Sequence, residues 1–204
     1  MTAEHEATGA ARTIAGPGPD ALGERFAARA GSVGARVHRV AGIPALAALV
    51  AELAGDGRVV VAPALAKTHD DLLAELVARG MDLGAVDAAD PAATFAGVAV
   101  GVSEAVLGLA ETGSLVVADA FADRLVRMLV PKHVAVLGAR WVVPGLDEAG
   151  AFLRETVAGG EGAPSHYVSF ITGPSRTADI EMSLTVGAHG PAELHIAILE
   201  GAGE

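Results

Sequence analysis

The sequence predicts an α/β protein built around a mostly parallel sheet whose two faces are covered. The chain has 204 residues with 51% hydrophobic content, which is enough for one sizeable core. Only seven residues are aromatic, so the core must consist of Ala, Val and Leu. Strand-length apolar runs alternate with helical patterns, and the strands read as continuous apolar runs, as is typical of buried parallel sheets.

The elements follow from apolar periodicity, turn residues and helix-end signals. Thr68 and Asp71 have the spacing of a capping box, which predicts a helix that ends at Gly80. The predicted strands are residues 36–40, 59–62, 97–101, 114–117, 133–137, 167–171 and 194–199. The other predicted helices are residues 20–30, 43–54, 103–111, 123–129 and 146–157, and residues 173–185 are predicted to be a loop that leads into a helix.

The domain organisation is predicted to be simple. Residues 1–19 have few large apolar side chains and end in Gly-Pro-Gly-Pro, so we expect a flexible N-terminal tail. No linker interrupts the remainder, which predicts a single α/β domain over residues 20–204.

Composition excludes several classes of partner. Acidic residues exceed basic ones by 25 to 14, and a net charge of −11 repels nucleic acid and anionic lipid. No apolar stretch approaches the roughly 20 residues that span a membrane, and the acidic start lacks the features of a signal peptide. We therefore expect a cytoplasmic protein with no membrane span.

The absence of cysteine narrows the chemistry further. Without cysteine the chain forms no disulfide, thiolate zinc site or catalytic thiol, and it carries no cysteine-bound iron–sulfur cluster. The histidines and carboxylates show no metal-ligand spacing such as HExxH, so no metal site is predicted. The sequence leaves any organic cofactor unknown.

A first candidate motif is AETGS, at residues 110–114, where the predicted short helix meets a strand. Gly113 allows a turn with positive φ, and the hydroxyls of Thr112 and Ser114 can donate hydrogen bonds to an anion or carbonyl. Glu111 would then lie at the mouth of a site as a nucleophile or base. The alternative is a solvated glutamate at a helix end.

The second motif is ITGPSRTADIE, at residues 171–181, and it is the most informative. A strand ends, Gly173 makes a turn, and the small hydroxyl residues Ser175 and Thr177 lead into a predicted helix whose free amides can bind an anion. Arg176 adds a planar cation that matches a carboxylate or phosphate.

Two acidic residues follow in this motif. Asp179 and Glu181 are candidates to position the arginine or to hold a substrate hydroxyl. Neither a dinucleotide-binding nor a P-loop spacing is present. The alternative is a capped helix with an exposed ion pair.

A third motif is a glycine-flanked histidine, GAHGP, at residues 187–191. Loop histidines such as His189 can act as general acid–base groups, because they titrate near neutral pH. His133, at the start of a predicted strand, is a second candidate. Many such histidines are simply solvated.

Together AETGS, the Pro-Lys-His at residues 131–133, ITGPSRTADIE and GAHGP resemble the LUD-domain family, in its lactate-utilisation protein C branch. The resemblance runs from about Phe26 to Glu200. It implies a fold similar to the NagB/RpiA/CoA-transferase-like superfamily, which is a Rossmann-like three-layer α/β sandwich. Members of the family accompany two iron–sulfur proteins in the oxidation of L-lactate to pyruvate. The implied partners are therefore iron–sulfur subunits and a small anionic metabolite.

The resemblance also suggests site residues by motif position. Glu111 and His189 are the candidates for proton transfer. The other matched positions, apart from Pro174, are the candidates to bind substrate or anion: Thr112, Gly113, Ser114, His133, Gly173, Ser175, Arg176, Thr177, Asp179 and Gly190.

Two other functions remain open. Glu111 and Gly113 resemble the Glu-x-Gly turn of some CoA-transferases, which would suit an independent enzyme acting on a CoA-linked or phosphorylated metabolite. A non-catalytic scaffold for the iron–sulfur subunits is the other alternative. The sequence does not decide whether this chain is itself catalytic.

Overall fold

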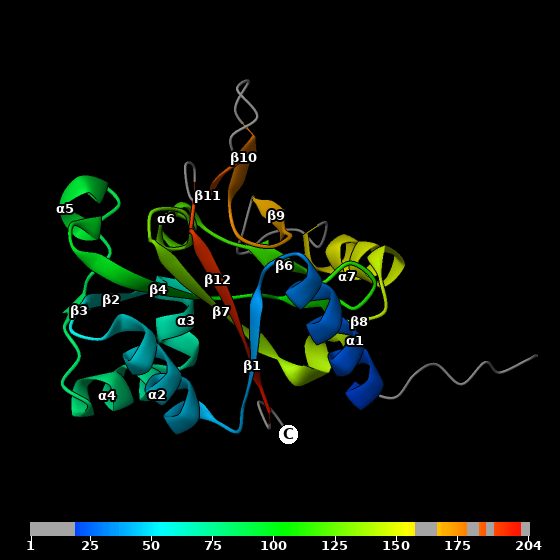
Figure 1. Cartoon of the computed structure of the whole chain (residues 1–204), viewed down its shortest axis with the longest axis horizontal. Helices are drawn as coiled ribbons and strands as arrows, with labels where there is room; N and C mark the ends of the chain where they lie inside the picture. The colour runs from blue at the N-terminus through cyan, green and yellow to red at the C-terminus, as the bar shows by residue number, and fades with distance from the viewer. Residues whose placement is uncertain (1–18, 158–166, 179–183, 187–189, 201–204) are drawn as a thin grey trace, which may run out of the picture.

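The fold combines two main sheets with helices around them (Figure 1). The computed structural model describes residues 19–157, 167–178, 184–186 and 190–200. The helices are α1 (Pro19–Ser32), α2 (Ile43–Ala54), α3 (Pro63–Thr68), α4 (Asp70–Ala78), α5 (Pro91–Phe95), α6 (Phe121–Met128), the 3₁₀ turn η1 (Ala139–Trp141) and α7 (Leu146–Val157). The strands are β1 (Arg36–Val40), β2 (Arg58–Val61), β3 (Leu83–Gly84), β4 (Val98–Glu104), β5 (Leu107–Leu109), β6 (Ser114–Ala118), β7 (Lys132–Gly138), β8 (Val142–Val143), β9 (Val168–Ile171), β10 (Arg176–Ala178), β11 (Leu184–Val186) and β12 (Glu193–Leu199).

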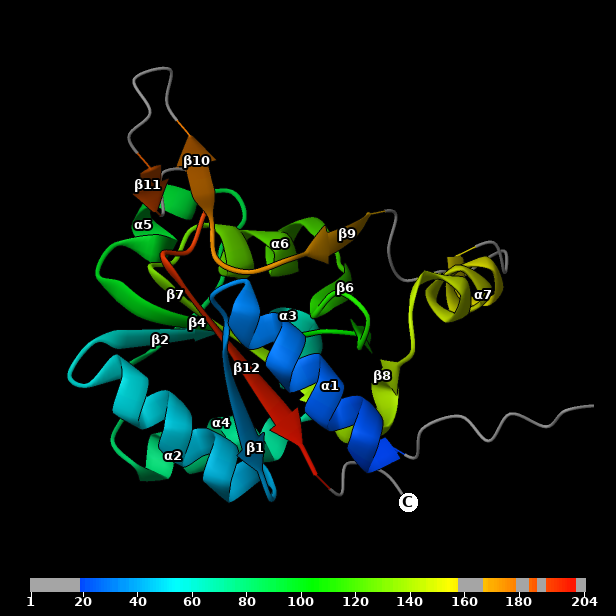
Figure 2. The same ribbon diagram turned by 45° about the vertical axis from the view of Figure 1, so that its right-hand side comes forward.

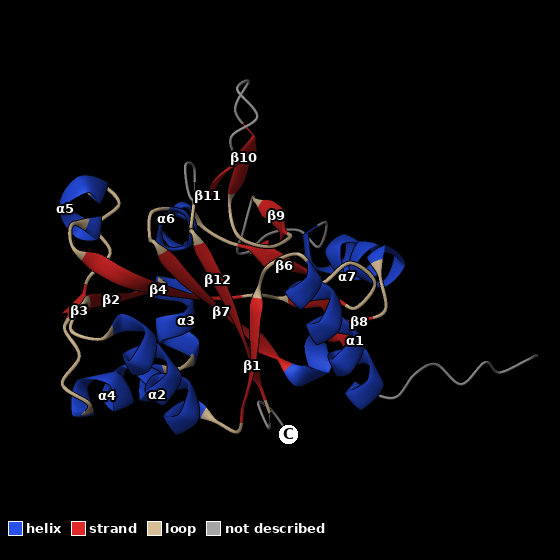
Figure 3. Cartoon of the chain, viewed as in Figure 1, coloured by secondary structure: helices blue, strands red, loops and turns tan. Residues whose placement is uncertain are grey.

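The principal sheet has the strand order β1-β12-β7-β4-β2-β3, and every neighbouring pair is parallel. This confirms the predicted fold class. Alternate residues of β7 enter different core clusters: Val134 packs with the residues of α2 and α4, whereas Leu137 packs with Phe26 of α1. Both faces of the sheet are therefore covered, and Figure 3 shows α2 and α4 on one side and α1 on the other.

The second sheet has the order β8-β5-β6-β9, and α7 packs against it through Ala149 and the buried Leu107. The prediction of a helix at residues 103–111 is wrong, because this segment contains the end of β4 and all of β5. A short apolar run does not distinguish a buried strand from a buried helix. The packing of Gly108 favours the strand. A Cβ at this position would lie 2.6 Å from a Leu137 methyl carbon, so β5 lies tightly against the principal sheet.

The capping box is also wrong. Thr68 is the last residue of α3, and its hydroxyl donates to the Leu65 carbonyl at 3.1 Å instead of capping the next helix. α4 begins at Asp70, after His69. The separate short helix α3 begins at Pro63, whose fixed φ suits a first helical position.

The third correction concerns residues 173–185. The described part of this segment forms β10 and β11, which pair antiparallel with Arg176 opposite Val186. The helix predicted after Ser175 is therefore wrong, and Arg176 lies on a strand. Cross-strand pairing with residues 184–186 satisfies these backbone groups, and the helix-start signals in the sequence do not reveal that pairing.

Most other boundaries agree with the prediction. β1, α2 and α7 begin and end at the predicted residues. The predicted tail lies outside the described residues except for Pro19, where α1 begins. Among the helices described, none is long and apolar enough to cross a membrane.

Candidate functional site

A pocket of about 520 Å³ lies between the end of α6, strand β9 and the amino-terminal ends of β7 and β12. Its lining comprises residues 167–175 together with Arg127, Met128, His133, Gly190, Pro191 and Leu194. Figure 2 shows α6 and β9 at the end of the molecule where β7 and β12 begin. The pocket thus joins segments that are far apart in the sequence.

Pro131 fixes the chain segments beside this pocket. It cannot continue a helix, and α6 ends three residues before it. Its carbonyl accepts hydrogen bonds from the amides of Ala192 and Glu193, at 3.0 and 3.2 Å. These bonds hold the start of β12 beside the start of β7 and bring Gly190 to the pocket.

His133 lies in the wall with 1% of its surface exposed. Its Nε2 is hydrogen-bonded to the Ser103 hydroxyl at 2.8 Å. Burial lowers the pKa of His133 to about 3, and the nearby positive charge of Arg127 and the His195 imidazole contribute in the same direction. At neutral pH the imidazole is therefore an uncharged hydrogen-bonding group.

Arg127 is the charged residue among the described side chains that line the pocket. Its Nε donates to the Asp119 carboxylate, and its Nη2 donates to the Ser169 hydroxyl at 3.1 Å. The guanidinium thereby connects α6 to β9. Arg127 is not among the predicted site residues, because no local pattern sets it apart from other arginines and Ser169 lies 42 residues away.

Three hydroxyls form a hydrogen-bonded row behind the pocket. Thr112 Oγ1 lies 2.8 Å from Ser114 Oγ, which lies 2.7 Å from Thr172 Oγ1. Thr172 lines the pocket, whereas Ser114 is buried. The AETGS motif therefore supports the second motif from behind.

The two motif glycines fit against the end of α1. Gly113 has φ 72°, and a Cβ there would lie 2.2 Å from the Ala30 nitrogen. Gly173 has φ 79°, and a Cβ there would lie 2.4 Å from the Val33 carbonyl oxygen. Both positions need glycine for conformation and for space.

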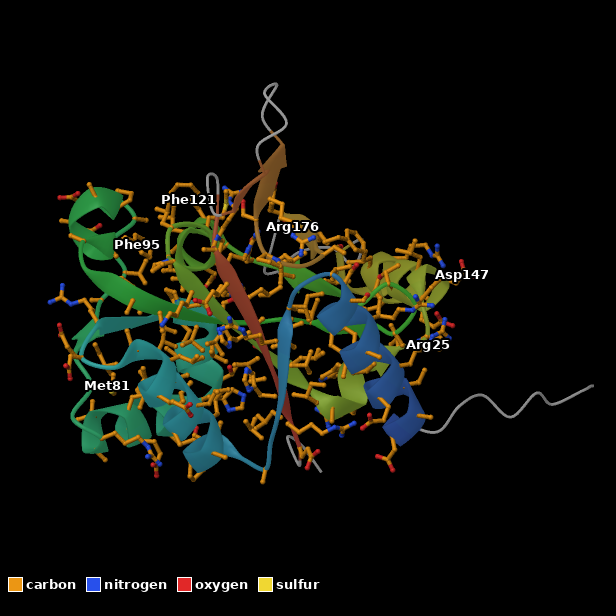
Figure 4. All side chains as sticks on the ribbon, viewed as in Figure 1. Arg25, Met81, Phe95, Phe121, Asp147 and Arg176 are labelled. Atoms are coloured by element: carbon orange, nitrogen blue, oxygen red, sulfur yellow. The ribbon has the colours of Figure 1, made fainter. Side chains whose placement is uncertain are left out.

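Glu111 and Arg176 do not line this pocket. Glu111 lines a second hollow of about 310 Å³, with Arg25 and residues 144–148. The exposed Arg176 donates from Nη2 to the Val33 carbonyl at 2.9 Å. Figure 4 shows Arg176 at the foot of β10, apart from Arg25.

The remaining predicted site residues are outside the description. Asp179, Glu181 and His189 are not among the described residues, nor is the side chain of Thr177. In the described parts, no group of three histidine or acidic side chains is arranged to hold a metal ion.

The model of the LUD domain family matches residues 23–199. The chain belongs to the LUD-domain family. This LUD domain is similar to "Lactate utilization protein C" of Bacillus licheniformis, with 34% identity over 102 residues, and to the protein of the same name from Bacillus subtilis, with 37% identity over 95 residues. The two matches cover 50% and 46% of this chain, but only 42% and 39% of those relatives.

A solved structure supports the fold of this LUD domain. The crystal structure of a DUF162 family protein from Deinococcus radiodurans matches with a TM-score of 0.63 and 19% sequence identity. The match covers 90% of this chain and 99% of that one. At this identity the likeness concerns the fold alone.

Because the pKa of the buried His133 is lowered, we expect acid to destabilise the LUD domain. Its folded pKa of about 3 lies below the unfolded value of 6.5, so below pH 6.5 the unfolded chain binds a proton that the folded chain excludes. The stability that His133 contributes is present above pH 6.5 and is lost as pH falls toward 3. At pH 4.5 the loss amounts to about 2–3 kcal/mol. Burial also lowers the pKa values of His38 and His195, which act in the same direction.

Denaturant unfolding at pH 7, 5.5 and 4.5 measures this effect. We expect His133→Gln, which keeps a hydrogen-bonding group toward Ser103, to flatten the pH dependence. His69→Gln replaces a histidine away from the pocket and serves as the matched control. An unchanged slope in His133→Gln would contradict the assignment.

Proposed function

We propose that this chain is a component of a lactate-utilisation system and that its pocket binds the carboxylate of a small 2-hydroxy or 2-oxo acid. The family and the names of its relatives support the system. The pocket lining supports a small acid as the ligand, since it brings together His133, Gly173, Ser175 and Gly190, which the family resemblance suggests as anion-binding positions.

The chemistry of the lining suits such an acid. The neutral His133 imidazole and the hydroxyls of Thr172 and Ser175 can hydrogen-bond carboxylate and C2 oxygens. Arg127 contributes positive charge, and no acidic side chain is among the described lining. The Asp119 carboxylate balances much of that charge. We therefore propose that Arg127 attracts the anion and also holds β9 in position through its hydrogen bond to Ser169.

Electron transfer would belong to other subunits. The sequence contains no cysteine, so iron–sulfur clusters with cysteine ligands would belong to the partners. Glu111 and His189 remain predicted proton-transfer residues and Arg176 a predicted anion contact. Glu111 lines the second hollow and Arg176 is absent from the lining of the first pocket, so neither is assigned a contact with the acid bound there.

Ligand titration followed by amide NMR tests the binding site. We expect L-lactate and pyruvate to shift the amides of Gly173, Ser175 and Gly190, and propionate, which has no C2 oxygen, to bind more weakly. Ser175→Ala should weaken L-lactate binding about fivefold, the usual worth of one hydrogen bond. Ser32→Ala, on the exposed end of α1, is the matched control.

Growth tests the role in the system. Deletion of the gene should abolish growth on L-lactate but not on pyruvate, and the Ser175→Ala variant should restore it only partly. Normal growth on L-lactate after deletion would overturn the role. Shifts confined to the second hollow would overturn the assignment of the site.

A further inference from the structure

One edge of β9 faces the pocket. β9 pairs with β6 along its other edge, and no described strand pairs with it on the pocket side. The nine consecutive residues 167–175 line the pocket, so residues that belong to both faces of the strand contribute to the lining. The pocket therefore runs beside the backbone of β9 and not over one of its faces.

The hydrogen-bond pattern identifies the backbone groups on that edge. The Asp119 amide donates to the Tyr167 carbonyl at 3.1 Å, so Tyr167 directs its backbone groups toward β6. In an antiparallel pair these directions alternate, which turns the N–H and C=O groups of Val168 and Phe170 outward. The strand opposite is consistent with this pattern. Val116 lies opposite Phe170, and its carbonyl accepts a hydrogen bond from the Val106 amide, so it faces away from β9.

The dimensions of the pocket exceed what a three-carbon acid needs. A volume of about 520 Å³ falls within the range of sites that enclose a drug-sized ligand. Met128, Pro191 and Leu194 provide apolar surface across from β9, and His133 provides an uncharged polar group. The unused volume thus combines a backbone edge with apolar walls.

We infer that this pocket also binds a planar nitrogen heterocycle with a lactam or ureide edge, as in a flavin, a pterin or a pyrimidine. The outward N–H and C=O of one strand residue can pair with the adjacent C=O and N–H of such a ring. The apolar residues opposite would cover the ring. This deepens the proposed function and rests on it for placing the acid at the Ser175 end of the same pocket.

An extended peptide offers the same amide groups, but the structure favours the smaller ligand. The hydrogen bond from Arg127 to Ser169 crosses from α6 to the middle of β9. A peptide that paired along the whole edge would meet this crossing. A ring needs only one residue of the edge.

Fluorescence titration of the full chain with riboflavin tests the inference, with uridine as a second ureide. We expect riboflavin to bind and 3-methylriboflavin, which has lost the ring N–H donor, to bind at least tenfold more weakly, since the Val168 or Phe170 carbonyl would stay unpaired. Proline is tolerated on an edge strand where its nitrogen faces outward. Phe170→Pro or Val168→Pro should therefore weaken riboflavin at least tenfold, whereas the matched alanine variants should stay within about threefold of wild type.

Each outcome decides the inference. It is overturned if neither riboflavin nor uridine binds, if the methylated analogue binds as well as riboflavin, or if both proline variants match their alanine controls. Displacement of riboflavin by a capped Thr-Val-Thr-Val peptide that shifts all of β9 would favour the peptide and also overturn it. If L-lactate causes no amide shifts in the pocket while riboflavin still binds there, the proposed acid site is overturned and the heterocycle site is retained.

Discussion

Replacing Gly113 with alanine is expected to lower the free energy of unfolding by about 3–5 kcal/mol, through left-handed strain together with overpacking. The residue has φ 72°, and the added Cβ would lie 2.2 Å from the Ala30 nitrogen. That neighbour is helix backbone, so relief requires α1 to move away from the β5–β6 turn. Urea unfolding of Gly113→Ala measures the loss.

Gly80→Ala separates the two causes. Gly80 has a closely similar φ of 75°, but nothing lies within 4 Å of its Cβ position. We expect this variant to lose only about 1–2 kcal/mol, which is the conformational part alone. Equal losses at the two positions would show that the approach of α1 to the AETGS turn contributes nothing.

Arg127→Met is expected to cost a similar amount, about 3–5 kcal/mol, because it removes the counter-charge that Arg127 gives to a buried carboxylate. The side chains of Arg127 and Asp119 are only 8% and 9% exposed. The variant also removes the hydrogen bond to Ser169 and with it the link between α6 and β9. Thermal and urea unfolding measure the change in stability.

A double-mutant cycle with Asp119→Asn tests the explanation. Adding Asp119→Asn to Arg127→Met should restore at least half of the lost stability, because the buried negative charge is then removed together with its arginine partner. Arg58→Met is the matched control: its ion pair with Asp82, at 2.9 Å, is exposed, and its loss should cost no more than about 1 kcal/mol. If the double variant is no more stable than the single one, the damage comes from lost packing and not from charge.

The candidate site could be predicted only in part. His133, Gly173, Ser175 and Gly190 belong to recognisable motifs, and they do line one pocket. Glu111 belongs to an equally clear motif, yet it lines a different hollow, since the turn at Gly113 directs the motif hydroxyls and the carboxylate to different places. A motif identifies residues that serve a common purpose, but not the direction in which each side chain points.

The sequence by itself determined the parallel sheet of this protein and excluded thiol chemistry. Continuous valine-rich runs are stable as strands only when both faces are covered, and that requirement is local enough to be read from β2 and β7. Tertiary structure alone decided that residues 107–109 form a strand, that Arg176 lies on a strand, and that Arg127 enters the pocket. Gly108 and Leu109 pair with Val142 and Val143, Arg176 pairs with Val186 between β10 and β11, and Arg127 bonds to Ser169, which is 42 residues away. Short-range propensities differ by less than the free energy of such contacts, so the tertiary contacts decided the outcome.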